Sequence, residues 1–409
     1  MDVNEPTALL AGLSPAQFMR RHWQKKPLLV RQALPGFQPL FSRAQLFKLA
    51  ASDDVESRVI EQRAKGWRMK SGPFKAGGLP PMSQAAWTLL VQGVDLHDAG
   101  AQALLQQFRF VPDARLDDLM VSFATEGGGV GPHFDSYDVF LFQASGRRRW
   151  KISRQKDLSL QEGVPLKILQ NFDPEEEFVL EAGDMLYLPP RYAHDGVAEA
   201  ATGVDGKPAD CTTYSIGFRA PAESEIAAAL LHRLAEFTEE AAEADAHDEA
   251  EGAAVKPAAP RLYRDPKQLA TQSPAEIPEG LAAFAQQAVM DAMKDPLALP
   301  CALGEHLTEP KSSVWFEEAA EPWDDDAAQG GQTGVRLDAR SRMMYDSAHI
   351  FINGESYRAK GADARLMRLL ADQRALAPAD LRKASDDALA LLGDWHGAGW
   401  LHQAPDAAA

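Results

Sequence analysis

Cysteine is scarce in this chain, which has two in 409 residues, Cys211 and Cys301. So few thiols exclude a disulfide-stapled scaffold and are typical of proteins in a reducing compartment. The N-terminus has no basic stretch ahead of an apolar run, as a signal peptide would have. No apolar run approaches the roughly 20 residues of a membrane-spanning helix either. We therefore expect a cytoplasmic protein with no membrane segment.

Positive charge is also in short supply. The 42 Lys and Arg residues are outnumbered by 59 Asp and Glu residues, so the formal net charge is -17 at pH 7. Nucleic acid would meet a field of its own sign, and we expect no direct nucleic-acid binding. A basic protein or peptide is the partner that this charge favours.

Short strands dominate residues 115–220, where alternating apolar residues are separated by glycine-rich turns. This pattern predicts a small all-β barrel or jelly roll. Ahead of it, Ser14 and Gln17 form the signature of a capping box at the start of a helix. Strands are expected at 28–30, 59–63, 67–69, 118–124, 133–144, 148–153, 177–180, 184–188 and 211–218, and further helices at 41–51 and 82–93.

A helical pattern follows the barrel. We expect helices at 223–243 and 281–293, separated by an Ala/Glu/Asp-rich insert near 241–259 that is exposed or disordered. The apolar face of these helices could pair with a second subunit or pack on its own domain, and the pattern leaves both open.

The last part of the chain combines expected strands with short helices. Strand-like stretches at 335–345 and 349–357 include an Asn353-Gly354 turn, and helices are expected at 362–373 and 385–396. This composition is typical of a winged-helix-like α+β domain. Its acidic residues between 317 and 326 favour protein contact or a structural role over DNA binding. The expected domains are 1–221, 222–296 and 297–409.

Residues 131–138 hold the residues with the clearest chemistry. His133 and Asp135 are two apart, and on a strand such residues face the same side. His194 follows the apolar strand expected at 184–188. Two imidazoles and one carboxylate on one side of a cation form the facial triad of non-haem Fe(II) oxygenases. Other cation centres of β-barrels remain possible from the residues alone.

Three consecutive arginines provide a candidate co-substrate anchor. In one large class of Fe(II) enzymes a 2-oxo acid chelates the metal, and its distal carboxylate needs a cation inside the barrel. We expect Arg147, Arg148 and Arg149 on the strand beside that of His133. Alternation sends Arg148 one way and its neighbours the other, so one arginine can bind a carboxylate bidentately. A basic edge strand that prevents aggregation is the alternative.

Strand alternation also suggests a substrate-binding surface. Asp118, Met120 and Ser122 share one face of the strand expected at 118–124. If Ser122 reaches the co-substrate pocket, the other two look into the same cavity, and a carboxylate there with no obvious partner suggests a cationic substrate group. Tyr137 shares a face with the ligands and either walls the substrate channel or packs in the core. Ser215 is a further candidate hydrogen-bond donor at the rim.

Six stretches of the chain resemble the JmjC-type ribosomal oxygenases, and most closely their bacterial branch. The eukaryotic relatives have lysine near the position of Arg148 and act on histidines. The resemblance covers nearly the whole chain, and its main departure is the insert near 241–259. The stretches are HWQKKPL at 22–28, MVSF at 120–123, GGGVGPHFDSYDVFL at 127–141, GRRRW at 146–150, GDMLYLPP at 183–190 followed by His194, and YSIGFRAP at 214–221.

This resemblance implies a fold and an activity. The fold is a double-stranded β-helix catalytic domain of the cupin/JmjC type, a helical dimerisation region of a homodimer and a C-terminal winged helix. Fe(II) is expected at His133, Asp135 and His194, 2-oxoglutarate at Arg148, and O₂ as the second co-substrate. The expected reaction is 3-hydroxylation of an arginine in the sixteenth protein of the large ribosomal subunit, with Asp118 facing the guanidinium.

Three alternatives remain. The chain could hydroxylate a histidine of another ribosomal protein. It could be a cupin-type metalloenzyme that acts on a small molecule without 2-oxoglutarate. It could also be a non-catalytic binding protein built from a β-barrel and a winged helix, although an intact triad speaks against that reading.

Overall fold

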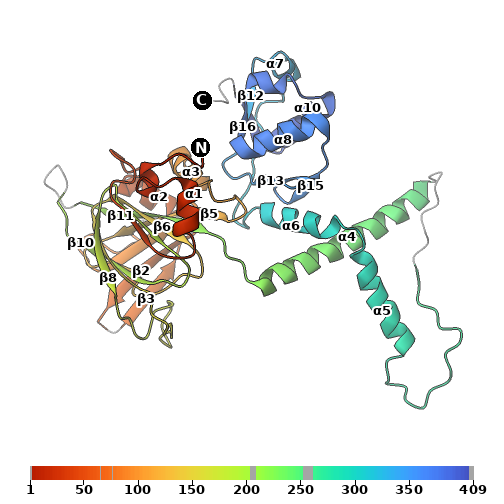
Figure 1. Ribbon diagram of the computed structural model, residues 1–409, viewed down its shortest axis with the longest axis horizontal. Helices are drawn as coiled ribbons and strands as arrows, with labels where there is room; N and C mark the ends of the chain where they lie inside the picture. The colour runs from red at the N-terminus through yellow and green to blue at the C-terminus, as the bar shows by residue number, and fades with distance from the viewer. Residues whose placement is uncertain (1, 65, 76, 203–208, 252–260, 405–409) are drawn as a thin grey trace. The chain divides into compact units, whose positions relative to one another are not determined.

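The N-terminal unit of the chain, Met1–Ala220, is built on two antiparallel sheets (Figure 1). The computed structural model describes residues 2–404 apart from 65, 76, 203–208 and 252–260. One sheet has eight strands in the order β1-β9-β6-β11-β5-β4-β2-β3, and the other has three in the order β10-β7-β8. The strands are β1 Leu28–Val30, β2 Ser57–Arg63, β3 Gly66–Ser71, β4 Trp87–Val91, β5 Leu116–Ala124, β6 Val139–Ser145, β7 Arg147–Ser153, β8 Glu176–Glu181, β9 Met185–Leu188, β10 Ala193–Glu199 and β11 Cys211–Phe218.

The inner faces of the two sheets enclose a small apolar core. Val139 and Leu141 of β6 pack in one buried cluster with Trp150 and Ile152 of β7. Because successive side chains of a strand point to opposite faces, β6 turns Phe140 to the other side of the larger sheet. This is the arrangement that the short strands of residues 115–220 predict.

Three helices cover the outer face of the larger sheet: α1 Pro15–Arg21, α2 Arg43–Leu49 and α3 Ala99–Gln106. Ser14 and Gln17 make the predicted capping box at the start of α1. Phe18 of α1 is fully buried, and its ring lies 5.4 Å from that of Phe140. The main hydrophobic core therefore lies outside the barrel and leaves the barrel interior for chemistry. Two 3-10 helices, Ala8–Leu10 and Val94–Leu96, complete the unit.

Several element predictions in this unit are wrong. The helix predicted at 82–93 is the strand β4, which is buried along its whole length. A strand covered on both faces has a continuous apolar sequence, which periodicity cannot distinguish from a buried helix. The strand predicted at 133–144 begins only at Val139. The sequence pattern also does not reveal β10, because His194, Asp195 and Gly196 interrupt its apolar alternation.

The C-terminal unit, Pro221–Ala409, begins with the helices α4 Glu223–Glu251, α5 Glu279–Ala292 and α6 Ala298–Thr308. Helix α4 extends beyond the predicted 223–243, so residues 241–251 of the predicted insert continue a helix, and 252–259 lie outside the described residues. Helix α4 packs along α6, and α6 packs on β13, β14 and β15. Among the described helices, none has both the length and the apolar character needed to cross a membrane.

The rest of this unit is a small α+β module of two three-stranded sheets, β16-β12-β17 and β13-β14-β15, and four helices. Asn353 and Gly354 form the predicted turn between β14 and β15, with φ of 50° and 91°, as a two-residue hairpin loop requires. Leu370, Leu392 and Trp395 belong to its buried core. The elements are α7 Asp325–Gln329, β12 Gly334–Leu337, β13 Met343–Tyr345, β14 Ile350–Ile352, β15 Glu355–Tyr357, α8 Gly361–Gln373, β16 Ala375–Leu376, α9 Pro378–Leu381, α10 Asp386–Gly397 and β17 Leu401–Ala404.

The packing of α6 on β14 depends on a glycine. A Cβ added at Gly304 would lie 2.2 Å from the ring of Phe351. We predict that Gly304→Ala lowers the free energy of unfolding by about 1–3 kcal/mol, because the ring must leave a packed site. Gly397→Ala is the control, since a Cβ there meets nothing within 4 Å. Chemical denaturation of the full chain compares the two, and equal stabilities would contradict this packing.

Candidate metal centre

Two backbone hydrogen bonds hold His133 and His194 side by side. The amide of His133 donates to the carbonyl of His194 at 2.9 Å, and the amide of His194 donates to the carbonyl of His133 at 2.8 Å. The pair forms an isolated antiparallel bridge, and the ring centroids lie 4.1 Å apart. The backbone thus sets the spacing of the two imidazoles.

Each imidazole is also oriented by a carbonyl. Nδ1 of His133 is 2.8 Å from the carbonyl oxygen of Gly131, and Nδ1 of His194 is 2.9 Å from that of Tyr192. A carbonyl only accepts, so each Nδ1 carries the proton and each Nε2 keeps its lone pair for a metal. Burial, and next the neighbouring His133, lower the pKa of His194 to about 4. It is therefore neutral near pH 7, as a metal ligand must be.

Asp135 completes the group. Its Oδ2 lies 3.7 Å from Nε2 of His194, and the ligand atoms of His133, Asp135 and His194 all lie within 4.8 Å of one another. Its carbonyl accepts a hydrogen bond of 2.7 Å from the amide of Arg191. Two imidazole nitrogens and a carboxylate oxygen at this spacing fit one divalent ion with open positions.

The structure brings the three predicted ligands together, but not on the predicted strand. Of His133 and Asp135, only His133 takes part in a β-bridge, and Asp135 lies in an irregular loop ahead of β6. The prediction that they share a regular strand is wrong. His194 follows β9, as predicted, but lies on a strand of its own as the second residue of β10. The ligand spacing holds nevertheless, since the bridge and the hydrogen bond from Arg191 replace the expected strand pairing.

Arg148 is the buried cation of the barrel. Its strand, β7, pairs with β10 and β8, so the prediction that it lies beside the strand of His133 is wrong. The predicted alternation is confirmed: Arg148 is 3% exposed, whereas Arg147 and Arg149 point outward and pair with glutamates. The alternative that the three arginines form a basic edge strand is wrong, because β7 is the middle strand of its sheet.

The guanidinium of Arg148 has unused hydrogen-bonding capacity. Within the described residues, its Nε and Nη2 have no hydrogen-bond partner, and its Nη1 reaches the carbonyl of Gly196 at 3.5 Å. Buried N–H donors without a hydrogen-bond acceptor are costly. This geometry fits a carboxylate ligand that would occupy both free nitrogens.

The predicted substrate surface is assembled on β5 and β11. Met120 pairs with Ser215, and Ser122 pairs with Thr213. Both Ser122 and Ser215 are buried. The residues next to them on each strand, such as Val121 and Tyr214, pack in the outer core. Met120, Ser122 and Ser215 therefore face the barrel interior.

Two substrate predictions need correction. Asp118 is not a carboxylate without an obvious partner, because it accepts a hydrogen bond of 3.1 Å from the amide of Gly93. Tyr137 does not pack in the core, since its side chain is 40% exposed. Desolvation of the hydroxyl, and next the charge of Asp135, raise the pKa of Tyr137 well above its usual range. An added Cβ at Gly217 would lie 3.7 Å from Asp118 and 4.0 Å from Tyr137, so the two side chains flank this glycine.

Comparisons with known proteins place this site in a family. A JmjC domain matches residues 103–226, and a ROXA-like winged helix matches residues 291–402. The ribosomal protein uL16 3-hydroxylase of Escherichia coli K12 is 38% identical over 212 residues. A probable ribosomal oxygenase of Haemophilus influenzae is 36% identical over 214 residues. Each alignment covers 51% of this chain and 53% and 50% of the relatives, so the chain spans about half the length of the curated relatives it matches.

Solved structures extend the likeness over nearly the whole chain. The X-ray structure of E. coli ycfD has a TM-score of 0.76 and 27% sequence identity, and the match covers 95% of this chain and 98% of that one. The chain thus resembles the ribosomal oxygenases over both its JmjC domain and its winged helix. A structure of E. coli YcfD in complex with cobalt and 2-oxoglutarate has a TM-score of 0.74 and 26% identity, over 96% and 98% of the two chains. The predicted fold class is confirmed.

Some residues around the candidate metal centre gave no functional signal in the sequence. The ring of Trp150 lies 5.8 Å from that of His194, and a Cβ at Gly196 would lie 2.5 Å from Trp150. Trp67 and Ile168 pack closely against Gly131, where an added Cβ would lie 2.7 Å from each side chain. These contacts join distant parts of the chain, so no local pattern reveals them.

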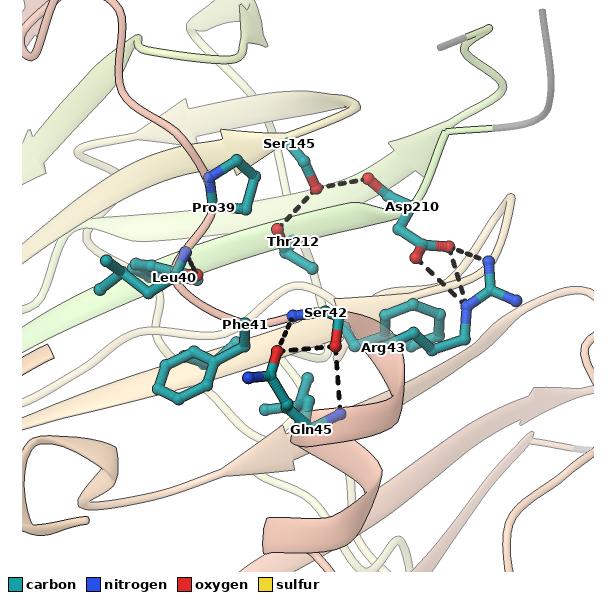
Figure 2. A pocket seen from close by; sticks show the side chains of 13 residues that line it. Pro39, Leu40, Phe41, Ser42, Arg43, Gln45, Ser145, Asp210 and Thr212 are labelled. Carbon is teal, nitrogen blue, oxygen red and sulfur yellow. Dashed lines mark hydrogen bonds and ion pairs between the residues drawn. The ribbon is translucent and has the colours of Figure 1, made fainter. Parts of the chain in front are cut away.

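A cavity of about 430 Å³ lies on the outer face of β5 and β11 (Figure 2). Val121, Phe123 and Tyr214 line it, and Arg43 and Asp210 form an ion pair at its rim. Alternation separates it from the candidate substrate surface, because Val121, Phe123 and Tyr214 point to the opposite face from Ser122 and Ser215. The cavity and that surface share the strands β5 and β11 but no side chains.

We predict that His133→Ala abolishes stoichiometric Co(II) binding by the metal-free protein, because one imidazole and one carboxylate no longer form a facial site. His232→Ala is the control, since that histidine of α4 has an 81% exposed side chain. Isothermal titration calorimetry measures both. Equal affinities of the two variants would contradict the assignment of His133 as a ligand.

Proposed function

We propose that the chain is an Fe(II)- and 2-oxoglutarate-dependent protein hydroxylase that 3-hydroxylates an arginine of the ribosomal protein uL16. The observation that carries this proposal is the buried, incompletely bonded guanidinium of Arg148 in the same barrel as His133, Asp135 and His194. A small-molecule cupin enzyme that works without a 2-oxo acid has no use for such a cation. The name of the E. coli relative supplies the substrate class.

Different residues of the chain would bind the metal, bind the co-substrate and exclude water. His133, Asp135 and His194 would hold the metal, and the open side of that triad leaves room for a chelating co-substrate. Fe(II), when bound, supplies the activation of O₂ that the hydroxylation requires. Arg148 would hold the distal carboxylate of 2-oxoglutarate, with Ser122 as an additional hydrogen-bond donor. The apolar residues between the sheets exclude water from this space.

Substrate recognition would use the side chains around Gly217. The carboxylate of Asp118 accepts from the amide of Gly93, and its Oδ1 would lie 3.7 Å from a Cβ added at Gly217. A carboxylate at this place suits a guanidinium, and the phenol of Tyr137 beside it suits the aliphatic part of an arginine. Met120 and Ser215 would complete the wall. The net charge of -17 also favours a basic ribosomal protein over an acidic one.

The cellular setting of the proposal is a homodimer in the cytoplasm. Both cysteines, Cys211 and Cys301, are free, which suits a reducing compartment. Helix α5 exposes an apolar surface: Val289 is 58% exposed and Met290 is 53% exposed. Large exposed apolar side chains on one helix favour burial against a second subunit.

We predict that Arg148→Ala raises the concentration of 2-oxoglutarate needed for half-maximal turnover roughly ten- to hundredfold, because charge-assisted hydrogen bonds to the carboxylate are lost. Turnover is measured as succinate release together with a gain of one oxygen atom in the mass of uL16, mapped to an arginine. Arg147→Ala is the matched control, since the side chain of Arg147 is 44% exposed and points outward.

An unchanged 2-oxoglutarate requirement in Arg148→Ala would move the anchor to another residue. Succinate release without any mass gain on an arginine would reject the substrate but keep the reaction class. A gain mapped to histidine would favour the histidine hydroxylases of this family.

For the dimer, we predict that the double variant Val289→Asp and Met290→Asp is a monomer in size-exclusion chromatography with light scattering, because charges replace the apolar contact. Gln286→Asp adds a charge to the same helix without removing an apolar side chain, and should remain dimeric. A wild-type monomer would reject the proposal.

A further inference from the structure

The loop that carries Asp135 has little backbone support. Residues 134–138 lie in neither a helix nor a strand. Its backbone anchors are the carbonyl of Asp135, which accepts from the amide of Arg191 at 2.7 Å, and the carbonyl of Asp138, which accepts from the amide of Phe218 at 3.2 Å. A metal ligand on an irregular loop needs further contacts to keep its carboxylate in place.

Asp138 supplies these contacts from the end of the loop. Its carboxylate is completely buried. One oxygen accepts from the hydroxyl of Tyr187 at 2.6 Å, and the other accepts from the side-chain amide of Gln24 at 3.0 Å and lies 3.6 Å from Arg115. A buried carboxylate held by three groups from separate segments can occupy only one position.

Tyr187 links this carboxylate to the N-terminal turn. Its hydroxyl donates to Asp138 and accepts from the backbone amide of Gln24 at 2.8 Å. Burial, and next the hydrogen bond to Asp138, raise the pKa of Tyr187 well above its usual range, so the hydroxyl keeps its proton. The ring of Trp23 stacks on Tyr187 at 6.1 Å. The HWQKKPL stretch therefore contacts the end of the metal-binding loop through Gln24, which gives that stretch a role that the proposed chemistry does not assign.

We propose that Asp138, Tyr187 and Gln24 are positioning residues that set the metal affinity of the triad by holding the Asp135 loop. This inference rests on the proposed function for the metal centre itself. It assigns the N-terminal turn a part in metal binding, although no residue of that turn is a candidate ligand. Residues that orient metal ligands through one intermediate group typically contribute roughly ten- to hundredfold in affinity.

The test uses Asp138→Asn and Tyr187→Phe in the full chain, with Co(II) as the probe. Both variants should bind Co(II) roughly ten- to hundredfold more weakly than the wild type, with altered visible absorption bands that report changed coordination. Tyr187→Phe keeps the ring and removes one hydroxyl, so it remains informative if Asp138→Asn fails to fold.

Asp184→Asn is the matched control. Asp184 is 3% exposed, binds Arg31 at 2.5 Å and accepts from the amide of Gln32. It stands at the opposite end of the β6–β9 pair from Asp138, since Val139 pairs with Leu188 and Phe142 with Met185. Its loss should lower the thermal midpoint and leave Co(II) affinity and absorption bands unchanged.

The outcomes distinguish the positioning role of these residues from the existence of the metal centre. Wild-type affinity and bands in Tyr187→Phe would overturn the positioning role while leaving the metal centre intact. Weakened binding in Asp184→Asn to the same extent would also overturn it, because general destabilisation would then explain the effect. Absence of Co(II) binding in the wild type would reject the metal centre and the inference with it.

Discussion

The reciprocal hydrogen bonds between His133 and His194 set the geometry on which the whole site depends. His133 lies in the segment that leads into β6 of the larger sheet, and His194 lies on β10 of the smaller sheet, so this bridge joins the two sheets. Asp135 follows His133 by two residues. Arg148 lies on β7, which is hydrogen-bonded to β10. A shift of either partner of the bridge would therefore move the three candidate ligands and Arg148 relative to one another.

The strands around the site each use their two faces for different purposes. β5 and β11 send Ser122 and Ser215 into the barrel and large apolar side chains such as Phe123 and Tyr214 into the outer core. β7 buries Arg148 and exposes its arginine neighbours to glutamates. Period-two alternation thus lets a short strand contribute to stability, solubility and chemistry at once. A one-residue change of register would exchange these roles, which is why register is strongly specified here.

Sequence patterns predict the residue types of the candidate site but not the contacts that hold those residues in place. The residue types of the triad and the parity of Arg148 could be predicted, because they depend on local spacing. The strand expected under Asp135 could not be excluded, since alternation in a sequence does not reveal where pairing ends. The amide of Gly93 on Asp118 depends on a turn distant in sequence. The same holds for the contacts of Trp67 and Ile168 with Gly131, for which no local periodicity exists.

The bond between Gln24 and Tyr187 joins residues 163 positions apart. A ribosome makes the N-terminal turn long before it makes the strand that receives it, so the turn has to wait for its partner during synthesis. Contacts of such long sequence separation form late, after the entropy of the intervening chain has been lost. The metal-binding loop then reaches its final form only when most of the N-terminal unit has left the ribosome. The segment around Gln24 is therefore among the first parts of the chain to be synthesised and among the last to form its native contacts.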